Sequence, residues 1–158
     1  MHEKCKYEIR EAKPEEWEDA MALAWRTFKR FEACEYTPEG VKNFLDFISD
    51  NALRKMFLIH EYRLWVALDG NRIVGLVSLR SGKLISLLFV DEHYHRQGIG
   101  RALTEQVWNF LKEKNIPFCT VNSSPYAVEF YHKLGFRDLA PQKLEAGMYI
   151  TPMRKELC

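Results

Sequence analysis

One polar stretch, HYHRQGIGRAL (93–103), has the residue types and spacing that suit anion binding. Gly98 and Gly100 let the backbone turn tightly and approach a ligand closely. If a helix begins here, the amides of its first turn have no partner inside the helix, and the helix dipole favours negative charge beside them. The amides expected to face a phosphate or pyrophosphate are those of Gln97, Gly98, Ile99, Gly100 and Arg101. His95, Arg96 and Arg101 add positive charge nearby.

A Gly-x-Gly pattern alone is a weak signal, because several kinds of loop contain it. A dinucleotide-binding turn places its first glycine directly behind a strand, whereas residues 91–97 intervene here. A P-loop needs Gly-Lys-Ser/Thr, which this chain lacks. The glycines could also serve only a strand-to-helix turn. From this motif alone, the anion site and the plain turn remain equally open.

Hydrophobic periodicity places the loop behind a run of strands and helices. Residues 6–12 alternate apolar and polar side chains, which predicts a half-buried strand. Pro14 opens a helical pattern, and Thr37 with Pro38 is typical of the cap and first residue of a second helix. The following strands are predicted over residues 62–68, 72–79 and 84–90. The Asp69-Gly70-Asn71 turn joins the first two as a hairpin, and the third is apolar enough to be central.

The second half of the chain continues the alternation. Its predicted elements are a helix from Ile99 to near Asn115, a strand over 117–122, a helix from Ser124 and a final strand over 147–157. Gly135 suits the left-handed position that ends the helix beginning at Ser124, with Phe136 folding back onto that helix. Pro152 cannot donate to a ladder, which predicts an edge position for the last strand.

The element order is therefore β-αα-βββ-α-β-α-β. A strand-helix-strand passage implies a parallel pair, whereas the hairpins imply antiparallel ones, so we expect a mixed α/β (α+β) sheet with helices on both faces. At 158 residues, with no internal repeat or linker, residues 1–158 are expected to form a single domain.

Composition excludes several classes of function. The net charge is +1, which leaves no basic excess for a nucleic-acid partner. No apolar run approaches the roughly 20 residues that span a bilayer, and the first residues lack the apolar core of a signal peptide. We expect no membrane association, and the four cysteines to be free thiols in a reducing cytoplasm. No Cys or His spacing suits a metal site.

Residues 95–100, read as His-Arg-Gln-Gly-Ile-Gly, resemble the Gln/Arg-x-x-Gly-x-Gly/Ala motif of the GNAT superfamily of N-acetyltransferases. The preceding SLLFVDEHY (86–94), the later VNSSPYAVEFYHKLGF (121–136) and the whole element order are also similar to this family. His95 departs from the motif, where the family has Gln or Arg. The resemblance implies a mostly antiparallel sheet of 6–7 strands, whose fourth and fifth strands splay apart around acetyl-CoA.

The resemblance also assigns cofactor contacts. The pyrophosphate would lie on residues 95–101, and the pantetheine arm would pair with the edge of the fourth strand. The expected contacts there are Leu88, Phe89 and Val90, with the Val90 N–H donating to the thioester carbonyl. Asn122, at the end of the fifth strand, would also contact the coenzyme. Tyr131 matches the tyrosine that family members use as general acid, and would contact the coenzyme as well.

The acceptor side is less determined. The fourth strand offers only Ser86 as a polar side chain, which favours a water relay over a direct carboxylate as general base. Acidic and aromatic residues near the turn after the first helix are candidates for binding the acceptor: Glu32, Glu35 and Tyr36, together with Ser86. We expect a primary amine of a small molecule or protein as substrate, and a monomer or homodimer.

Two other functions remain open at this point. A non-catalytic acyl-CoA-binding sensor would keep the anion site without transferring an acyl group. A nucleotide-binding α/β domain would prefer NAD or ATP to CoA. Retention of Tyr131 and of an open strand edge favours the enzyme.

Overall fold

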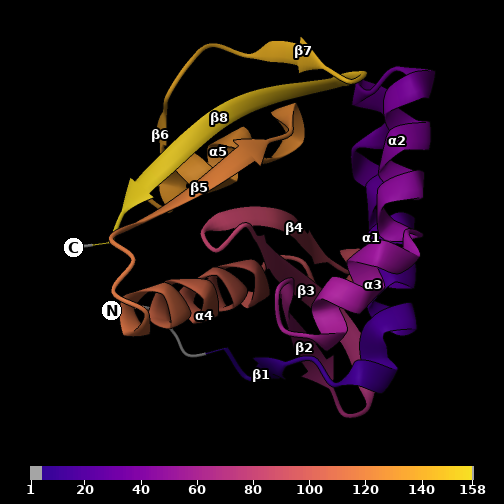
Figure 1. The fold of residues 1–158 in the computed structure, drawn as a ribbon, viewed down its shortest axis with the longest axis vertical. Helices are drawn as coiled ribbons and strands as arrows, with labels where there is room; N and C mark the ends of the chain where they lie inside the picture. The colour runs from indigo at the N-terminus through magenta and orange to yellow at the C-terminus, as the bar shows by residue number, and fades with distance from the viewer. Residues whose placement is uncertain (1–4, 158) are drawn as a thin grey trace.

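The computed structural model describes residues 5–157, which form one eight-stranded sheet with helices on both faces (Figure 1). The strand order is β1-β2-β3-β4-β5-β8-β6, with β7 beside β8. The strands are β1 (Glu8–Glu11), β2 (Arg63–Asp69), β3 (Arg72–Arg80), β4 (Leu84–Val90), β5 (Phe118–Ser123), β6 (Arg137–Asp138), β7 (Lys143–Glu145) and β8 (Met148–Glu156). The helices are α1 (Trp17–Phe31), α2 (Pro38–Ile48), α3 (Asn51–Leu58), α4 (Ile99–Glu113) and α5 (Val128–Lys133).

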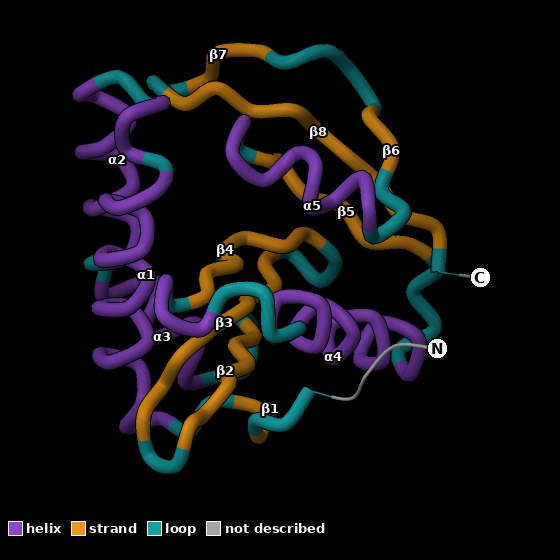
Figure 2. The backbone as a smooth tube through the Cα atoms, turned by 180° about the vertical axis from the view of Figure 1, so that it is seen from behind, coloured by secondary structure: helices purple, strands orange, loops and turns teal. Residues whose placement is uncertain are grey.

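The helices divide the core into two layers. Helices α1, α2 and α3 stand together on one face of β2–β4, and α4 lies on the other (Figures 1 and 2). Alternate residues of one strand enter opposite layers: Leu64 and Val66 pack under α1, whereas Trp65 and Ala67 pack under α4. This two-sided burial explains why the middle strands are almost continuously apolar.

Local sequence signals account for the element ends. The Thr37 hydroxyl accepts the Gly40 amide at 3.1 Å and caps α2, with Pro38 as its first residue, as predicted. Gly70 adopts a φ of 62° in the β2–β3 hairpin. Gly135, at a φ of 96°, ends α5, and the Phe136 amide returns to the Tyr131 carbonyl.

Three details differ from the sequence prediction. Helix α3 begins directly after α2. The helix is interrupted at Asp50, whose side chain accepts the Ala52 amide and caps the new helix. Strands β6 and β7 are two and three residues long, too short to show a period. The edge position predicted from Pro152 is wrong: β8 lies between β5 and β6. The Pro152 carbonyl accepts the Leu139 amide, so the backbone of Pro152 faces the segment just after β6. Because β6 has already ended there, the N–H that proline lacks removes little pairing between β8 and β6.

Within residues 5–157, no helix is both long and apolar enough to cross a bilayer.

The turn between β7 and β8 is fastened to the start of α2. The Gly147 carbonyl accepts both the Thr37 amide and the Thr37 hydroxyl, each at 3.1 Å, and Asn43 donates to the Ala146 carbonyl at 3.0 Å. The two backbones touch at Gly40 and Gly147, where a β-carbon on either residue would overlap the other's backbone. This contact joins the C-terminal hairpin to the helices of the first third of the chain.

We predict that Gly40→Ala lowers the free energy of unfolding by about 1–3 kcal/mol through this overlap. Without the overlap, replacing glycine by alanine inside a helix would raise the free energy of unfolding by roughly 0.5–1 kcal/mol. A decrease therefore indicates the backbone contact, and an increase indicates its absence. Urea denaturation measures it, with exposed Glu39→Ala in the same helix as the control. A more stable Gly40→Ala protein would contradict the contact.

Candidate functional site

Strands β4 and β5 separate soon after they meet. Their parallel pairing consists of Leu84 with Thr120 and Ile85 with Val121. A bulge follows at once, because Leu79 pairs with Ile85 while Ser78 pairs with Leu87, which leaves Ser86 as the extra residue. Beyond this point, no strand formed by residues 5–157 lies beside β4 on the side that faces away from β3. The splay that the family resemblance implied is therefore present.

The ladder with β3 determines which groups of β4 face the opening. The Asp91 amide donates to the Val74 carbonyl at 2.8 Å, so Asp91 and then Phe89 direct their backbone groups toward β3. By alternation, the backbone groups of Leu88 and Val90 point the other way, into the splay. The ring of Phe89 instead packs against Phe44, at 5.9 Å between centroids.

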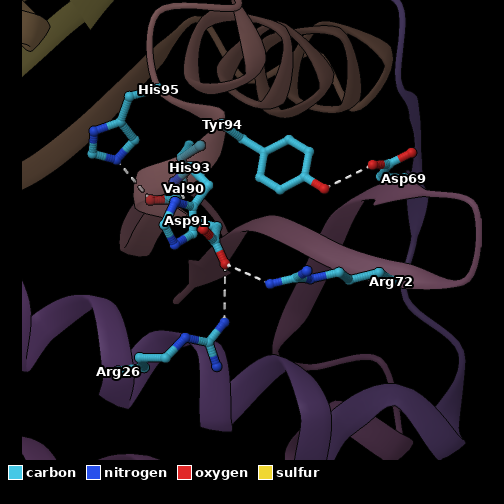
Figure 3. A network of polar contacts seen from close by, with 8 residues as sticks. All are labelled: Arg26, Asp69, Arg72, Val90, Asp91, His93, Tyr94 and His95. Atoms are coloured by element: carbon cyan, nitrogen blue, oxygen red, sulfur yellow. Dashed lines mark hydrogen bonds and ion pairs between the residues drawn. The ribbon is translucent and has the colours of Figure 1, made fainter.

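The loop after β4 is held in place by side-chain contacts (Figure 3). Asp91 accepts the His93 amide at 2.9 Å and Arg26 at 3.1 Å, and Arg72 lies 3.5 Å away. Burial of Asp91 alone would raise its pKa, but the amide and the arginines outweigh it and hold this pKa below the usual value. Tyr94 donates to Asp69 at 2.7 Å. These contacts fix the path of the chain from β4 to α4.

His95 has a defined place in this loop. Its Nε2 lies 2.8 Å from the Val90 carbonyl, as Figure 3 shows, so the side chain bridges the loop to the end of β4. On its other side, the ring packs against Phe31 of α1, at 5.0 Å between centroids. These two contacts hold His95 between the end of β4 and α1.

The turn into α4 has the features of an anion site. Gly98 is the N-cap, at a φ of 81°, and the Ala102 amide makes the first helical hydrogen bond, to the Gly98 carbonyl. The amides of Ile99 and Gly100 therefore have no partner within the helix. A β-carbon added to Gly98 would meet nothing within 4 Å, so open space lies beside this backbone. The neighbouring Gln97 accepts the Tyr7 hydroxyl at 2.7 Å.

A cavity of about 420 Å³ lies between α2, β4, β5 and the β7–β8 turn. It brings together five of the residues singled out from the sequence: Glu32, Tyr36, Ser86, Asn122 and Tyr131. Leu88 and Phe89 also line it, whereas the α4 turn lies outside. Within residues 5–157, no group of three or more His, Cys, Asp or Glu side chains is arranged to hold a metal ion.

Tyr131 is buried at the cavity wall. Its ring packs edge-on against Phe130 and Phe136, and only 4% of the residue is exposed. Burial, with the nearby Glu32 carboxylate, raises the pKa of Tyr131 well above its ordinary value. The raised pKa keeps Tyr131 in its neutral, protonated form at physiological pH.

Ser86, expected to take part in a water relay, belongs to a buried hydroxyl cluster. The Tyr62 hydroxyl lies 2.6 Å from the Ser78 hydroxyl and donates to Ser86 at 3.1 Å. Burial raises the pKa of Tyr62 to about 12. The Ser78 hydroxyl also accepts the Leu87 amide at 3.0 Å. The cluster thus stabilises the bulge of β4 and leads into the core rather than to solvent.

The acidic candidates after α1 have different surroundings. Glu35 accepts the Tyr126 amide at 3.1 Å, in the short turn that precedes α5, and does not line the cavity. Glu32 does line it, is only 9% exposed and accepts a hydrogen bond from Ser124. Burial raises the pKa of Glu32 to about 7, and the Glu35 carboxylate adds to the effect. Burial also raises the pKa of the Tyr36 hydroxyl. No sequence signal indicated the burial of Glu32, because this residue follows an exposed-looking helix end.

Comparisons with known proteins agree with this geometry. Residues 32–157 match the acetyltransferase (GNAT) domain family. A relative from Escherichia coli K12, described as the uncharacterized N-acetyltransferase YafP, is 26% identical over 145 residues and covers 91% of each chain. A GCN5-related N-acetyltransferase structure from Rhodopseudomonas palustris has a TM-score of 0.83 at 21% identity, with 99% of each chain covered. The PaiA N-acetyltransferase of Thermoplasma acidophilum, solved with coenzyme A, has a TM-score of 0.79 at 19% identity, with 96% of this chain and 99% of that chain covered.

The chain therefore belongs to the GNAT family of acetyltransferases, which confirms the resemblance drawn from residues 95–100 and 121–136. It is an acetyl-CoA-dependent N-acetyltransferase with a mixed, mostly antiparallel sheet.

We predict that Glu32→Gln stabilises the protein at pH 8 and has little effect at pH 5. Because the folded-state pKa is raised from 4.5 to about 7, protonated Glu32 contributes stability below pH 4.5 that is lost as the pH rises through 7. An amide keeps the acceptor for Ser124 without the buried charge. The expected gain at pH 8 is on the order of 2–3 kcal/mol. Urea denaturation at both pH values tests it, and an equal effect at both would contradict it.

Proposed function

We propose that this enzyme binds acetyl-CoA along the open edge of β4 and transfers the acetyl group to a primary amine of a small molecule or protein. The observation that carries the proposal is the continuity of the site: the amide-bearing turn at Gly98 follows the β4 edge, which leads to the cavity holding Tyr131.

The coenzyme contacts follow from the directions of backbone groups. The amides of residues 98–101 would bind the pyrophosphate, helped by the α4 dipole and by Arg96 and Arg101. The pantetheine amides would pair with Leu88 and Val90 as a short added strand. Because His95 already contacts the Val90 carbonyl, the Val90 N–H is the group left for the thioester oxygen. Gln97, Ile99 and Asn122 complete the proposed contacts, whereas Phe89, expected from the resemblance to contact the coenzyme, pairs with β3 and packs its ring against Phe44.

The chemistry needs an aligned amine, a polarised carbonyl and a proton for the departing thiolate. Binding both reactants side by side supplies much of the rate through proximity. The Val90 N–H would stabilise the charge that develops on the carbonyl oxygen, by about 2–4 kcal/mol. Tyr131, kept neutral by its burial, would donate its proton to the thiolate. Tyr36 and Ser86, which line the cavity, stay candidates for contacts with the acceptor, whereas Glu35 lies outside it.

Thiol release tests the function directly. The protein is mixed with acetyl-CoA and a panel of phenethylamine, spermidine, lysine and a peptide with a free N-terminus. Amine-dependent thiol release, with acetylated product seen by mass spectrometry, supports the proposal. Saturable CoA binding without release from any amine would instead indicate a sensor. Stronger competition by NAD or ATP than by CoA would indicate a nucleotide-binding domain.

We predict that Gly98→Asn weakens CoA binding at least about tenfold, because a side chain would enter the space beside the α4 amides. Asparagine tolerates the left-handed conformation, so folding should change little. Gly82→Asn is the matched control, since Gly82 has a φ of 84° and lies outside the site. Calorimetry measures both affinities, and an unchanged value for Gly98→Asn would refute the anion site.

We predict that Tyr131→Phe lowers kcat by about 10²-fold with little change in CoA affinity, because it removes only the proton donor. Steady-state thiol release gives kcat, and calorimetry gives the affinity. An unchanged kcat would mean that water or another group protonates the thiolate.

A further inference from the structure

Glu32 is a buried carboxylate without a countercharge. It follows the end of α1, and its side chain reaches the wall of the cavity, where Ser124 donates to it. Its negative charge acts on the hydroxyls of Tyr36, Tyr126 and Tyr131. The carboxylate therefore lies near the proposed acid, at the wall of the cavity.

The charged groups around Glu32 do not neutralise it. Within residues 5–157, it makes no ion pair with a lysine, arginine or histidine. The neighbouring charge on its own turn, Glu35, is also negative. From the α5 side it faces Ser124, Tyr126 and Tyr131, none of which is cationic. Arg80 also lines the cavity, but its guanidinium lies over the Phe47 ring, 5.4 Å from the centroid, and makes no ion pair with Glu32 within the described residues. Burying such a group costs free energy unless a cation or a proton compensates it.

Other candidates for a base are less well placed. Strand β4 carries no carboxylate, and its Ser86 is held by Tyr62. Glu145 also lines the cavity, but it is exposed and lies 3.5 Å from Lys143. Glu32 thus combines burial, access to the cavity and proximity to Tyr131.

Building on the proposed function, we propose that Glu32 is the general base that binds the acceptor ammonium and removes its proton. The amine nitrogen then forms a bond to the thioester carbonyl carbon, and the carbon–sulfur bond breaks. Glu32 takes one proton from the ammonium before the attack and passes it to water in the cavity, and the nitrogen loses a second proton to water as the carbon–sulfur bond breaks. The thiolate takes the proton of Tyr131. Tyr131 is reprotonated from solvent, so protons and charge balance over the cycle.

The acid–base properties of Glu32 agree with this role. Its pKa of about 7 makes it both partly ionised and basic enough at neutral pH. Alkylammonium groups resemble the lysine side chain, with a pKa near 10.4, so an acceptor arrives as a cation. The ionised carboxylate would attract that cation, which supplies the countercharge that the protein lacks.

The test compares Glu32→Gln with wild type, using the fastest amine of the panel between pH 5.5 and 9.5. We expect kcat/KM to fall by about 10²–10³-fold, and the limb with a midpoint near pH 7 to disappear. CoA affinity should be unchanged. Glu39→Gln, which removes an exposed carboxylate outside the cavity, should superimpose on wild type. An analogue of the same amine that carries two or three fluorines on the carbon β to the nitrogen is far less protonated at neutral pH and should lose less activity.

The outcomes separate the inference from the function beneath it. If wild type is active and Glu32→Gln has the same rate or the same pH profile as wild type, the role of Glu32 is wrong but the proposed function stands. An equal loss for the amine and its fluorinated analogue would show that Glu32 serves structure or binding rather than proton removal. No thiol release from wild type with any amine would overturn the proposed function and this inference together.

Discussion

The parallel contact between β4 and β5 is only two residue pairs long, and the rest of the site depends on its shortness. A longer ladder would satisfy the backbone groups of Leu88 and Val90 within the protein. Because the ladder stops at Ile85, these groups face a space where a ligand can supply the missing hydrogen bonds. The bulge at Ser86, held by the hydroxyls of Tyr62 and Ser78, fixes the point at which the strands part. A polar cluster behind β4 thus determines where the edge of this strand becomes open.

Stability and activity make opposite demands on the end of α1. A neutral side chain at position 32 would suit the folded state better at alkaline pH, because an unpaired charge is costly in a buried site. The same isolation gives the carboxylate its basicity near neutral pH. Sites of this kind are expected where function, rather than folding, determines the residue.

Much of this architecture was predictable because it rests on local rules. Thr37 with Pro38, the turn at Gly70 and the closing residue Gly135 each require a particular backbone geometry, so they mark element ends reliably. The spacing of Gly98 and Gly100 likewise indicated an amide-rich turn. Tyr131 could be placed only through the resemblance to a family.

The remaining features depend on contacts between distant parts of the chain. Burial of Glu32 results from packing against the start of α5, almost a hundred residues away in sequence. The interior position of β8 depends on β6 and β7, which are too short to show a period. The contact of His95 with Val90 depends on the path of the loop, which Asp91 and its arginines fix.

The fastening of the β7–β8 turn to α2 has a mechanical consequence. Two residue pairs join the halves of the sheet on one side of the cavity, and the Thr37–Gly147 contacts join them on the opposite side. The two halves of the sheet cannot move apart as rigid bodies without breaking one of these links. The β7–β8 turn thus braces the wall of the cavity opposite the β4–β5 contact, and the spacing of the two walls depends on both links.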